Sequence, residues 1–167
     1  MASINGIQVK GLKSFSGHDG EPLAQGNVYY KGKKLGFWSQ DAWGGEDNYD
    51  FNESVVDAEV AKFRESDAVE DEYREFADLA SLLEDLVNFM HTEKEYKKGI
   101  KMGYPTYVEA TDGYHVCGYY TRQTDKDAIK ETAYYEKFMS NFRKTAFKNK
   151  KVKVSIFNCK EDFDIVY

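Results

Sequence analysis

The sequence predicts an α+β protein: a mostly antiparallel sheet built from hairpins, with about three helices packed on one face. Two observations carry this prediction. Short segments rich in strand-forming residues flank Gly-centred turns in both halves of the chain. A longer central segment instead repeats its apolar residues at helical spacing. The 167 residues, 41% of them hydrophobic, can bury a core and are most simply a single domain, residues 1–167.

Strand signals open the chain. Residues 7–15 alternate imperfectly between apolar and polar types, which predicts a strand with a bulge at Gly11. A glycine-rich loop follows over residues 16–26. Residues 27–30 and 34–38 then flank Lys31-Gly32-Lys33, and this arrangement predicts a tight β-hairpin.

The middle of the chain carries the helical signals. Asn52 is the predicted N-cap of a first helix. A D-x-x-E pattern at Asp67 and Glu70 predicts the start of a second, longer helix that ends near Gly99. Its core-facing stripe repeats at spacings of four and three: Val69, Tyr73, Phe76, Ala80, Leu83, Val87 and Met90.

Further hairpins and a helix complete the prediction. Residues 106–109 and 114–117 bracket Asp112-Gly113, a strong hairpin signal. Thr124 with Asp127 forms a capping box that opens a helix to about Lys148. Residues 152–156 and 163–165 alternate in polarity and predict a final hairpin around residues 158–162.

Charge is strongly segregated along the sequence. Eighteen of the 29 acidic residues lie between Asp41 and Glu95, with only four Lys or Arg among them. A later stretch reverses this bias, with Glu136 as its single acid among the basic residues Lys137, Arg143, Lys144, Lys148, Lys150, Lys151 and Lys153. Such segregation creates a field that a charged partner can feel.

Both charged regions have alternative interpretations. The acidic residues are either the solvated faces of two helices or a surface resembling the phosphate array of nucleic acid, which would enter a basic groove. The second interpretation assigns partner binding to Glu72, Glu75, Asp78 and Asp85. The basic stretch offers another interpretation, direct contact with nucleic acid. The phosphate contacts would come from Arg143, Lys144, Lys148, Lys150 and Lys151. Bases would stack on the nearby rings of Tyr134, Tyr135 and Phe147.

An aromatic loop is the second candidate for partner binding. Trp38 and Trp43 lie beside Gly44-Gly45, and exposed tryptophans often anchor protein interfaces. The alternative is that the rings fold back to cover the end of the sheet. Both interpretations hold if one ring anchors a partner while the other covers the end of the sheet.

Enzyme signals are sparse. The loop His18-Asp19-Gly20-Glu21 offers an imidazole and two carboxylates for a divalent metal or for acid–base chemistry, but the same residues also suit a polar turn. Cys117 and Cys159 lie far apart and match no metal-ligand spacing. We therefore expect no catalytic residue, no metal and no cofactor.

Targeting signals are also lacking in the sequence. The first residues show neither a charged nor an apolar region of a signal peptide. No apolar run approaches the roughly 20 residues of a membrane helix. We expect a reducing cytosol and no membrane contact.

The first 45 residues combine a short strand, a G-x-[DE]-G loop and a hairpin that ends in a Gly-Gly loop. The segments are Gly11-Leu12-Lys13-Ser14-Phe15, Gly17-His18-Asp19-Gly20-Glu21, Gly26-Asn27-Val28-Tyr29, Gly32-Lys33-Lys34-Leu35-Gly36 and Ala42-Trp43-Gly44-Gly45. This order of motifs resembles that of small proteins carried by phages and mobile elements of bacteria. Some small acidic proteins of that setting are anti-CRISPR inhibitors of Cas9-type nucleases. The resemblance carries over no functional residue.

Together, charge and resemblance lead to one expectation and two alternatives. We expect a non-enzymatic anti-defence protein in the host bacterial cytosol that binds a nucleic-acid-targeting nuclease or its guide complex, plausibly Cas9. Acidic helices would enter the basic channel, and Trp38 and Trp43 would anchor the contact. The first alternative is a nucleic-acid-binding accessory protein that uses the basic residues. The second is a protein that binds or hydrolyses a nucleotide signal at His18, Asp19 and Glu21.

Overall fold

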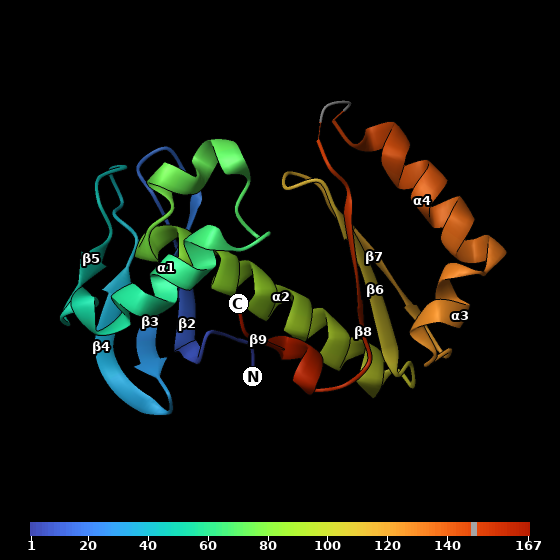
Figure 1. Cartoon of the computed structure of the whole chain (residues 1–167), viewed down its shortest axis with the longest axis horizontal. Coiled ribbons are helices and arrows are strands. Elements are labelled where there is room, and N and C mark those ends of the chain that lie inside the picture. The colour runs from blue at the N-terminus through green and yellow to red at the C-terminus, as the bar shows by residue number, and fades with distance from the viewer. Residues whose placement is uncertain (148–149) are drawn as a thin grey trace. The chain divides into compact units, whose positions relative to one another are not determined.

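Two β-sheets and their accompanying helices make up the computed structural model, which describes residues 1–147 and 150–167 (Figure 1). The predicted α+β class and mostly antiparallel pairing are confirmed, although the strands form two sheets rather than one. The described residues divide into unit 1, Met1–His91 with Phe163–Tyr167, and unit 2, Thr92–Asp162. The expectation of a single domain stays a prediction, because a division in space does not measure whether the units unfold together.

Unit 1 contains a six-stranded sheet with the strand order β5-β4-β3-β2-β1-β9. The strands are β1 (Ser3–Ile4), β2 (Ile7–Ser16), β3 (Pro22–Tyr30), β4 (Lys33–Ser39), β5 (Asn48–Tyr49) and β9 (Asp164–Ile165). Neighbouring strands are antiparallel except β1 and β9, which run parallel with Ser3 opposite Asp164. The sheet therefore joins the two ends of the chain.

Backbone conformation explains the two predicted features of this sheet. Lys31 and Gly32 have φ angles of 48° and 80° and form the two-residue turn between β3 and β4. A turn with two positive φ angles matches the twist of the strands that it joins. Gly11, with φ of 67°, lies at the register shift between Lys10 and Lys13, so the predicted bulge is confirmed.

The helical region of unit 1 is more interrupted than the sequence predicts. Asn52 does act as an N-cap, because its side chain accepts a hydrogen bond from the backbone N–H of Ser54. The continuous helix predicted from Asp67 to Gly99 is wrong, since a 3₁₀-helix and a break precede the long helix. The segments are η1 (Glu53–Val56), α1 (Asp57–Glu65), η2 (Asp71–Phe76) and α2 (Leu79–Lys101).

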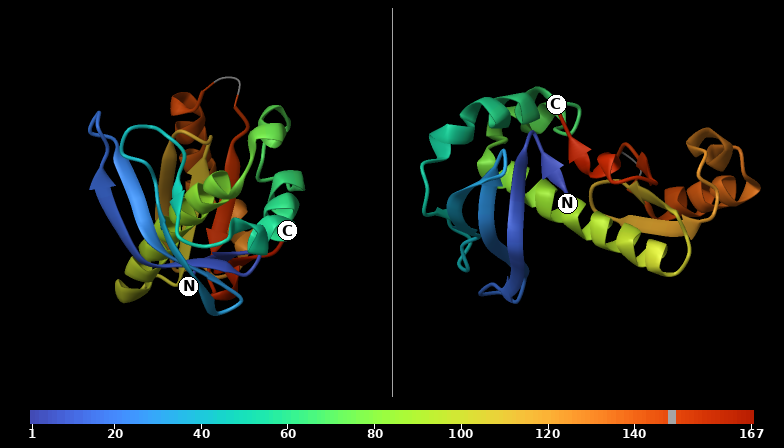
Figure 2. Two further views of the ribbon diagram at one scale, coloured as in Figure 1. Left: turned by 90° about the vertical axis from the view of Figure 1, so that its left-hand side faces the viewer. Right: turned by 90° about the horizontal axis from the view of Figure 1, so that it is seen from below.

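Leucines of the first half of α2 build the core of unit 1. Leu82, Leu83 and Leu86 are fully buried against the inner face of the six-stranded sheet (Figure 2). The buried residues that share this cluster include Ile7, Val9, Val28, Trp38, Val60 and Phe63. Burying side chains of this size contributes about 1.5–3 kcal/mol each, so this contact fixes α2 on the sheet.

Unit 2 contains a three-stranded antiparallel sheet in which β6 (Thr106–Thr111) lies between β7 (Val116–Thr121) and β8 (Lys153–Phe157). The Asp112-Gly113 turn joins β6 to β7, as predicted. Met139 and Phe142 of α4 (Ala133–Thr145) pack on Ala110 of this sheet.

Two C-terminal predictions are wrong. The helix expected from Thr124 to Lys148 divides into α3 (Lys126–Lys130) and α4, because the Thr132 side chain caps α4 through the backbone N–H of Tyr135. Lys148 lies outside the described residues. The expected final hairpin does not form, since β8 pairs with β6 whereas β9, which follows the 3₁₀-helix η3 (Glu161–Phe163), pairs with β1.

Candidate functional site

The segregation of charge along the sequence follows the division into units. Unit 1 contains 19 Asp and Glu against 8 Lys and Arg, a formal net charge of −11. Unit 2 contains 15 Lys and Arg against 10 Asp and Glu, a net charge of +5, and together they give the −6 of the chain. Each unit therefore presents its own electrostatic character to a partner.

Two arginines position the 3₁₀-helix η2 in unit 1. Arg64, at the end of α1, donates a hydrogen bond from Nε to the carbonyl of Ala77 at 2.8 Å. Arg74, within η2, donates from Nε to Asp71 at 2.8 Å and lies 3.6 Å from the carboxylate of Glu65. These contacts hold η2 between α1 and α2 although none of its six residues is buried.

A groove of about 390 Å³ runs beside η2. Buried Phe63, Val69 and Ala77 contribute apolar lining, and the exposed rings of Tyr73 and Phe76 also line it. Tyr73 is 50% exposed and Phe76 is 69% exposed. An apolar hollow with two exposed aromatic rings is the kind of surface that anchors a protein partner.

Carboxylates border this groove. Glu70, Glu84 and Asp85 line it together with the apolar residues. Burial raises the pKa of the nearby Tyr167 phenol to about 12, and the negative charges of Asp85 and Asp67 add to that rise. The groove therefore combines apolar contact area with a negative potential.

The four predicted acidic residues have different places around this groove. Glu72 and Glu75 are exposed on η2, whereas Asp85 is half-buried and lines the groove. Asp78 is exposed but also structural, because its Oδ1 accepts a hydrogen bond from the backbone N–H of Ser81 at 2.9 Å and caps α2. Unit 1 contains all four, so one region of the fold carries the predicted acidic set.

The sequence does not reveal the roles of Tyr73 and Phe76. Both fit the apolar repeat of the predicted long helix, which places them in the core. Both belong instead to the 3₁₀-helix η2, which the extended backbone of Ala77 separates from α2, and both are exposed there. The signal that would have revealed the break is Asp78 three residues before Ser81, a standard N-cap spacing.

The two tryptophans of the aromatic loop serve opposite purposes. Trp38 is 0% exposed, and its indole N–H donates to the Asp47 carboxylate at 2.7 Å. The Trp38 ring packs in the core, on the same side of β4 as the buried Gly36. The prediction that Trp38 binds a partner is therefore wrong. Trp43 is 76% exposed and keeps its predicted place at the surface.

Hydrogen bonds fix the loop that presents Trp43. Asp41 Oδ2 accepts hydrogen bonds from the backbone N–H groups of Trp43 at 3.0 Å and Gly45 at 2.9 Å. The imidazole of His18 stacks on the indole with ring centroids 4.1 Å apart. One face of the Trp43 ring is therefore covered by His18 while the residue as a whole is exposed.

The predicted metal or acid–base loop has the geometry of a turn. The Gly17 N–H donates to the carbonyl of Glu21 at 2.9 Å, and the Asp19 N–H donates to the Glu21 carboxylate at 3.0 Å. His18 is engaged in the stack on Trp43. Within residues 1–147 and 150–167, no group of three or more His, Cys, Asp or Glu is arranged to hold a metal ion.

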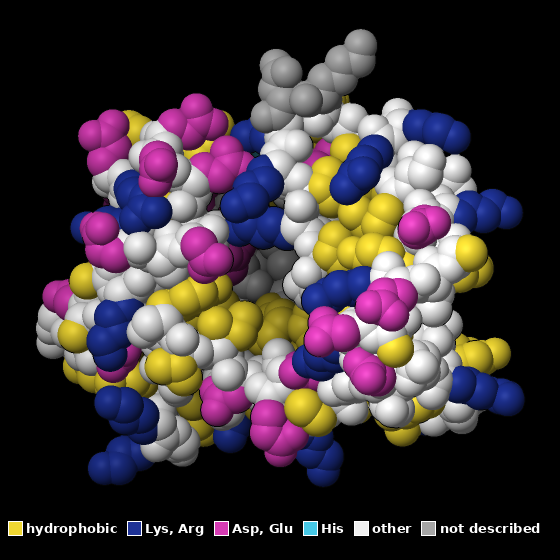
Figure 3. Space-filling model, turned by 45° about the vertical axis from the view of Figure 1, so that its right-hand side comes forward, with side chains coloured by type: hydrophobic (Ala, Val, Ile, Leu, Met, Phe, Trp, Pro, Cys, Tyr) yellow, Lys and Arg dark blue, Asp and Glu magenta, His cyan; other side chains and the backbone are white. Residues whose placement is uncertain are grey.

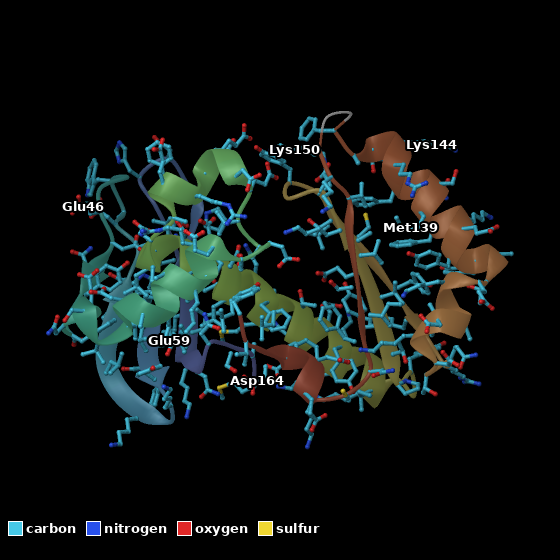
Figure 4. The ribbon with its side chains drawn as sticks, in the orientation of Figure 1. Glu46, Glu59, Met139, Lys144, Lys150 and Asp164 are labelled. Carbon is cyan, nitrogen blue, oxygen red and sulfur yellow. The ribbon has the colours of Figure 1, made fainter. Side chains whose placement is uncertain are left out.

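The predicted basic residues lie in unit 2. Arg143 and Lys144 are exposed in the last turn of α4, and Lys151 is exposed before β8. Lys150 has its Nζ 5.6 Å from the ring centroid of Tyr114, an aromatic contact that the sequence did not predict. Figure 4 labels Lys144 on α4 and Lys150 after it. Lys148 lies outside the described part of the chain.

No helix among the described residues combines the length and apolar character needed to cross a membrane. No family model, curated protein or solved structure matches the chain.

Proposed function

We propose that this chain is a non-enzymatic binding protein that uses the acidic groove of unit 1 to occupy a basic surface of a nucleic-acid-targeting nuclease. The observation that carries the proposal is the exposure of Tyr73 and Phe76 beside a groove bordered by Glu70, Glu84 and Asp85. Two exposed aromatic rings next to carboxylates offer both apolar contact and charge to a partner. A purely solvated acidic helix would offer only charge.

The chemistry of the groove defines the complementary surface. An apolar side chain of the partner would enter between Tyr73 and Phe76, and flanking Lys or Arg would pair with the surrounding carboxylates. The exposed Trp43 provides a further aromatic contact in the same unit. Its fixed loop lowers the entropy lost on binding, because Asp41 already holds the backbone.

The charge of unit 1 supports a nuclease as the target class. Nucleases that hold nucleic acid do so in positively charged channels, and duplex DNA presents about one charge per 1.7 Å of axis. With a net charge of −11, unit 1 would compete for such a channel. The proposed partner is an RNA-guided nuclease of the Cas9 type, with its guide, in the bacterial cytosol.

A panel of guide-loaded Cas9-type nucleases tests this function. Complex formation and target cleavage are measured with the wild-type chain and with a Tyr73→Ala/Phe76→Ala variant. The control is Tyr134→Ala, which removes an exposed ring from unit 2. We expect a complex that blocks cleavage, weakened by about 2 kcal/mol or more in the groove variant and unchanged in the control.

Each other outcome contradicts a defined part of the proposal. If no nuclease of the panel binds the chain, the proposed target class is wrong. If a complex forms and survives the loss of both groove rings at full affinity, the groove is not the contact. Thermal unfolding of each variant separates loss of binding from loss of fold.

A further inference from the structure

We propose that unit 2 carries a second binding surface, specific for single-stranded nucleic acid. Two exposed aromatic rings, Tyr114 of the β6–β7 turn and Phe147 after α4, form it together with neighbouring cations. We call this set the aromatic–basic surface, and its residues are Tyr114, Phe147, Arg143, Lys144, Lys150 and Lys151. The inference goes beyond the proposed function, which rests on unit 1 alone.

One buried carboxylate brings the two ring-bearing segments together. Asp112 accepts hydrogen bonds at Oδ1 from the backbone N–H groups of Tyr114 at 3.0 Å and His115 at 2.7 Å. Its Oδ2 accepts from the backbone N–H of Phe147 at 2.9 Å. The backbones of Tyr114 and Phe147, 33 positions apart in sequence, are therefore both bound to one residue, Asp112, that is 2% exposed.

The rings meet at the surface rather than in the core. Tyr114 is 65% exposed and Phe147 is 54% exposed, and they contact each other edge to face with centroids 5.3 Å apart. The His115 ring lies 5.1 Å from Phe147 and completes the cluster. Because neither ring is covered by the core, both offer area on which an unstacked base can lie.

One cation contacts this cluster, and others lie close to Phe147 in sequence. Lys150 has its Nζ 5.6 Å from the centroid of the Tyr114 ring, and Arg143 and Lys144 lie in the last turn of α4, which ends two residues before Phe147. On the face shown in Figure 3, hydrophobic side chains gather at the upper right with Lys, Arg, Asp and Glu side chains around them. Since salt confines electrostatic fields to about 8 Å at physiological ionic strength, the local excess of cations matters more than the chain's net charge of −6.

The combination of rings and cations selects the ligand class. Cations alone would serve any acidic partner, whereas stacking on an exposed ring requires a flat base that is free of its own stack. Bases of a duplex are stacked within the helix, so a single strand fits this surface better. Phosphates would meet Arg143, Lys144 and Lys151 while bases lie on Tyr114 and Phe147.

The test of this inference is the binding of a fluorescently labelled thymidine oligonucleotide of about 12 nucleotides. Fluorescence anisotropy measures its affinity for the protein at several salt concentrations. The aromatic variant is Tyr114→Ala/Phe147→Ala, and the basic variant is Arg143→Glu/Lys144→Glu.

The control is Lys101→Glu/Lys160→Glu, which reverses two exposed charges of unit 2. Lys101 precedes β6, and Lys160 follows β8, whose Phe157 pairs with Tyr107 near the start of β6. Both control residues therefore lie at the opposite end of β6 from the turn.

The two variants should differ in their salt dependence. The aromatic variant should weaken binding about tenfold with an unchanged slope of log affinity against log salt. The basic variant should make that slope shallower by about 1.4, because each phosphate contact on a single strand contributes about 0.7. The control should bind as the wild type does, and a duplex of the same length should bind more weakly.

Three results would overturn the inference. The first is that the wild-type protein does not bind the oligonucleotide at low salt. The second is that the aromatic variant binds the oligonucleotide as tightly as the wild type does. The third is displacement of the oligonucleotide by polyglutamate of equal charge as readily as by unlabelled oligonucleotide, which would show recognition of charge alone.

Discussion

The guanidinium of Arg64 donates a hydrogen bond to the carbonyl of Ala77 at 2.8 Å and so ties the end of α1 to the residues just before α2. In return, Arg74 reaches the carbonyl of Arg64 at 3.5 Å. The segment enclosed by these two contacts carries the exposed Tyr73 and Phe76. The shape of the acidic groove therefore depends on arginine–carbonyl hydrogen bonds and not only on apolar packing.

Arg64→Ala should loosen the groove. The substitution leaves the buried Ala77 carbonyl without this donor, which should lower the free energy of unfolding by about 1–2 kcal/mol in urea denaturation. Amide hydrogen exchange at residues 71–77 should accelerate. Arg143→Ala, at an exposed position of α4, should change stability by less than about 0.5 kcal/mol. Unchanged exchange in the Arg64 variant would show that other contacts hold η2.

The tryptophans provide a matched pair for testing burial. Trp38→Phe removes the indole donor to Asp47 from the core and should cost about 1–3 kcal/mol, whereas Trp43→Phe should change stability by less than about 0.5 kcal/mol. Acrylamide should strongly quench the fluorescence of the exposed Trp43, which remains in Trp38→Phe. It should only weakly quench that of the buried Trp38, which remains in Trp43→Phe. Equal quenching in both variants would contradict the assignment of one ring to the core and one to the surface.

Asp112→Asn should destabilise unit 2 in a pH-dependent way. The hydrogen bonds from the backbone N–H groups of His115, Phe147 and Tyr114, together with the His115 side chain, hold the pKa of Asp112 below its ordinary value of 3.8. A carboxylate with a lowered pKa stabilises the fold fully above its unfolded pKa and loses that contribution as the pH falls.

The difference in melting temperature between the wild type and Asp112→Asn should therefore be largest above about pH 5 and narrow at lower pH. Asp127→Asn, at an exposed residue of α3, should show no comparable narrowing. A constant difference from pH 7 to pH 3 would contradict the role given to the ionised Asp112.

The prediction of a single domain can be tested with the natural fluorophores. Trp38 and Trp43 both belong to unit 1, so tryptophan emission reports the unfolding of that unit, whereas far-UV circular dichroism reports both units. If the chain is one cooperative domain, the two urea transitions should coincide. Transitions with separate midpoints would show that the two units unfold independently.

The features that the sequence predicted correctly are local. The Lys31-Gly32 turn, the bulge at Gly11 and the cap at Asn52 each follow from a few adjacent residues whose backbone preferences decide the structure. The Asp112-Gly113 turn belongs to the same class. Local chemistry of this kind can be read without knowing the rest of the fold.

The features that it missed are non-local. The pairing of β9 with β1 joins residues some 160 positions apart, and no local pattern in either strand specifies that partner. Tyr73 and Phe76 matched a helical stripe, and only the position of the helix break decides that they are exposed. Of the candidate site, the acidic residues could be proposed from composition, but the groove required the contacts of Arg64 and Arg74.

The rate of association with a guide-loaded Cas9-type nuclease tests the acidic-groove mechanism most directly. It is compared at low salt between the wild type, the variant Glu72→Gln/Glu75→Gln/Asp78→Asn/Asp85→Asn, and the control Glu131→Gln/Glu136→Gln. The Asn at position 78 retains a capping side chain for α2. We predict that association of the acidic variant slows about tenfold or more, an effect that higher salt reduces, while its stability changes little. Association as fast as that of the wild type at low salt would contradict the mechanism.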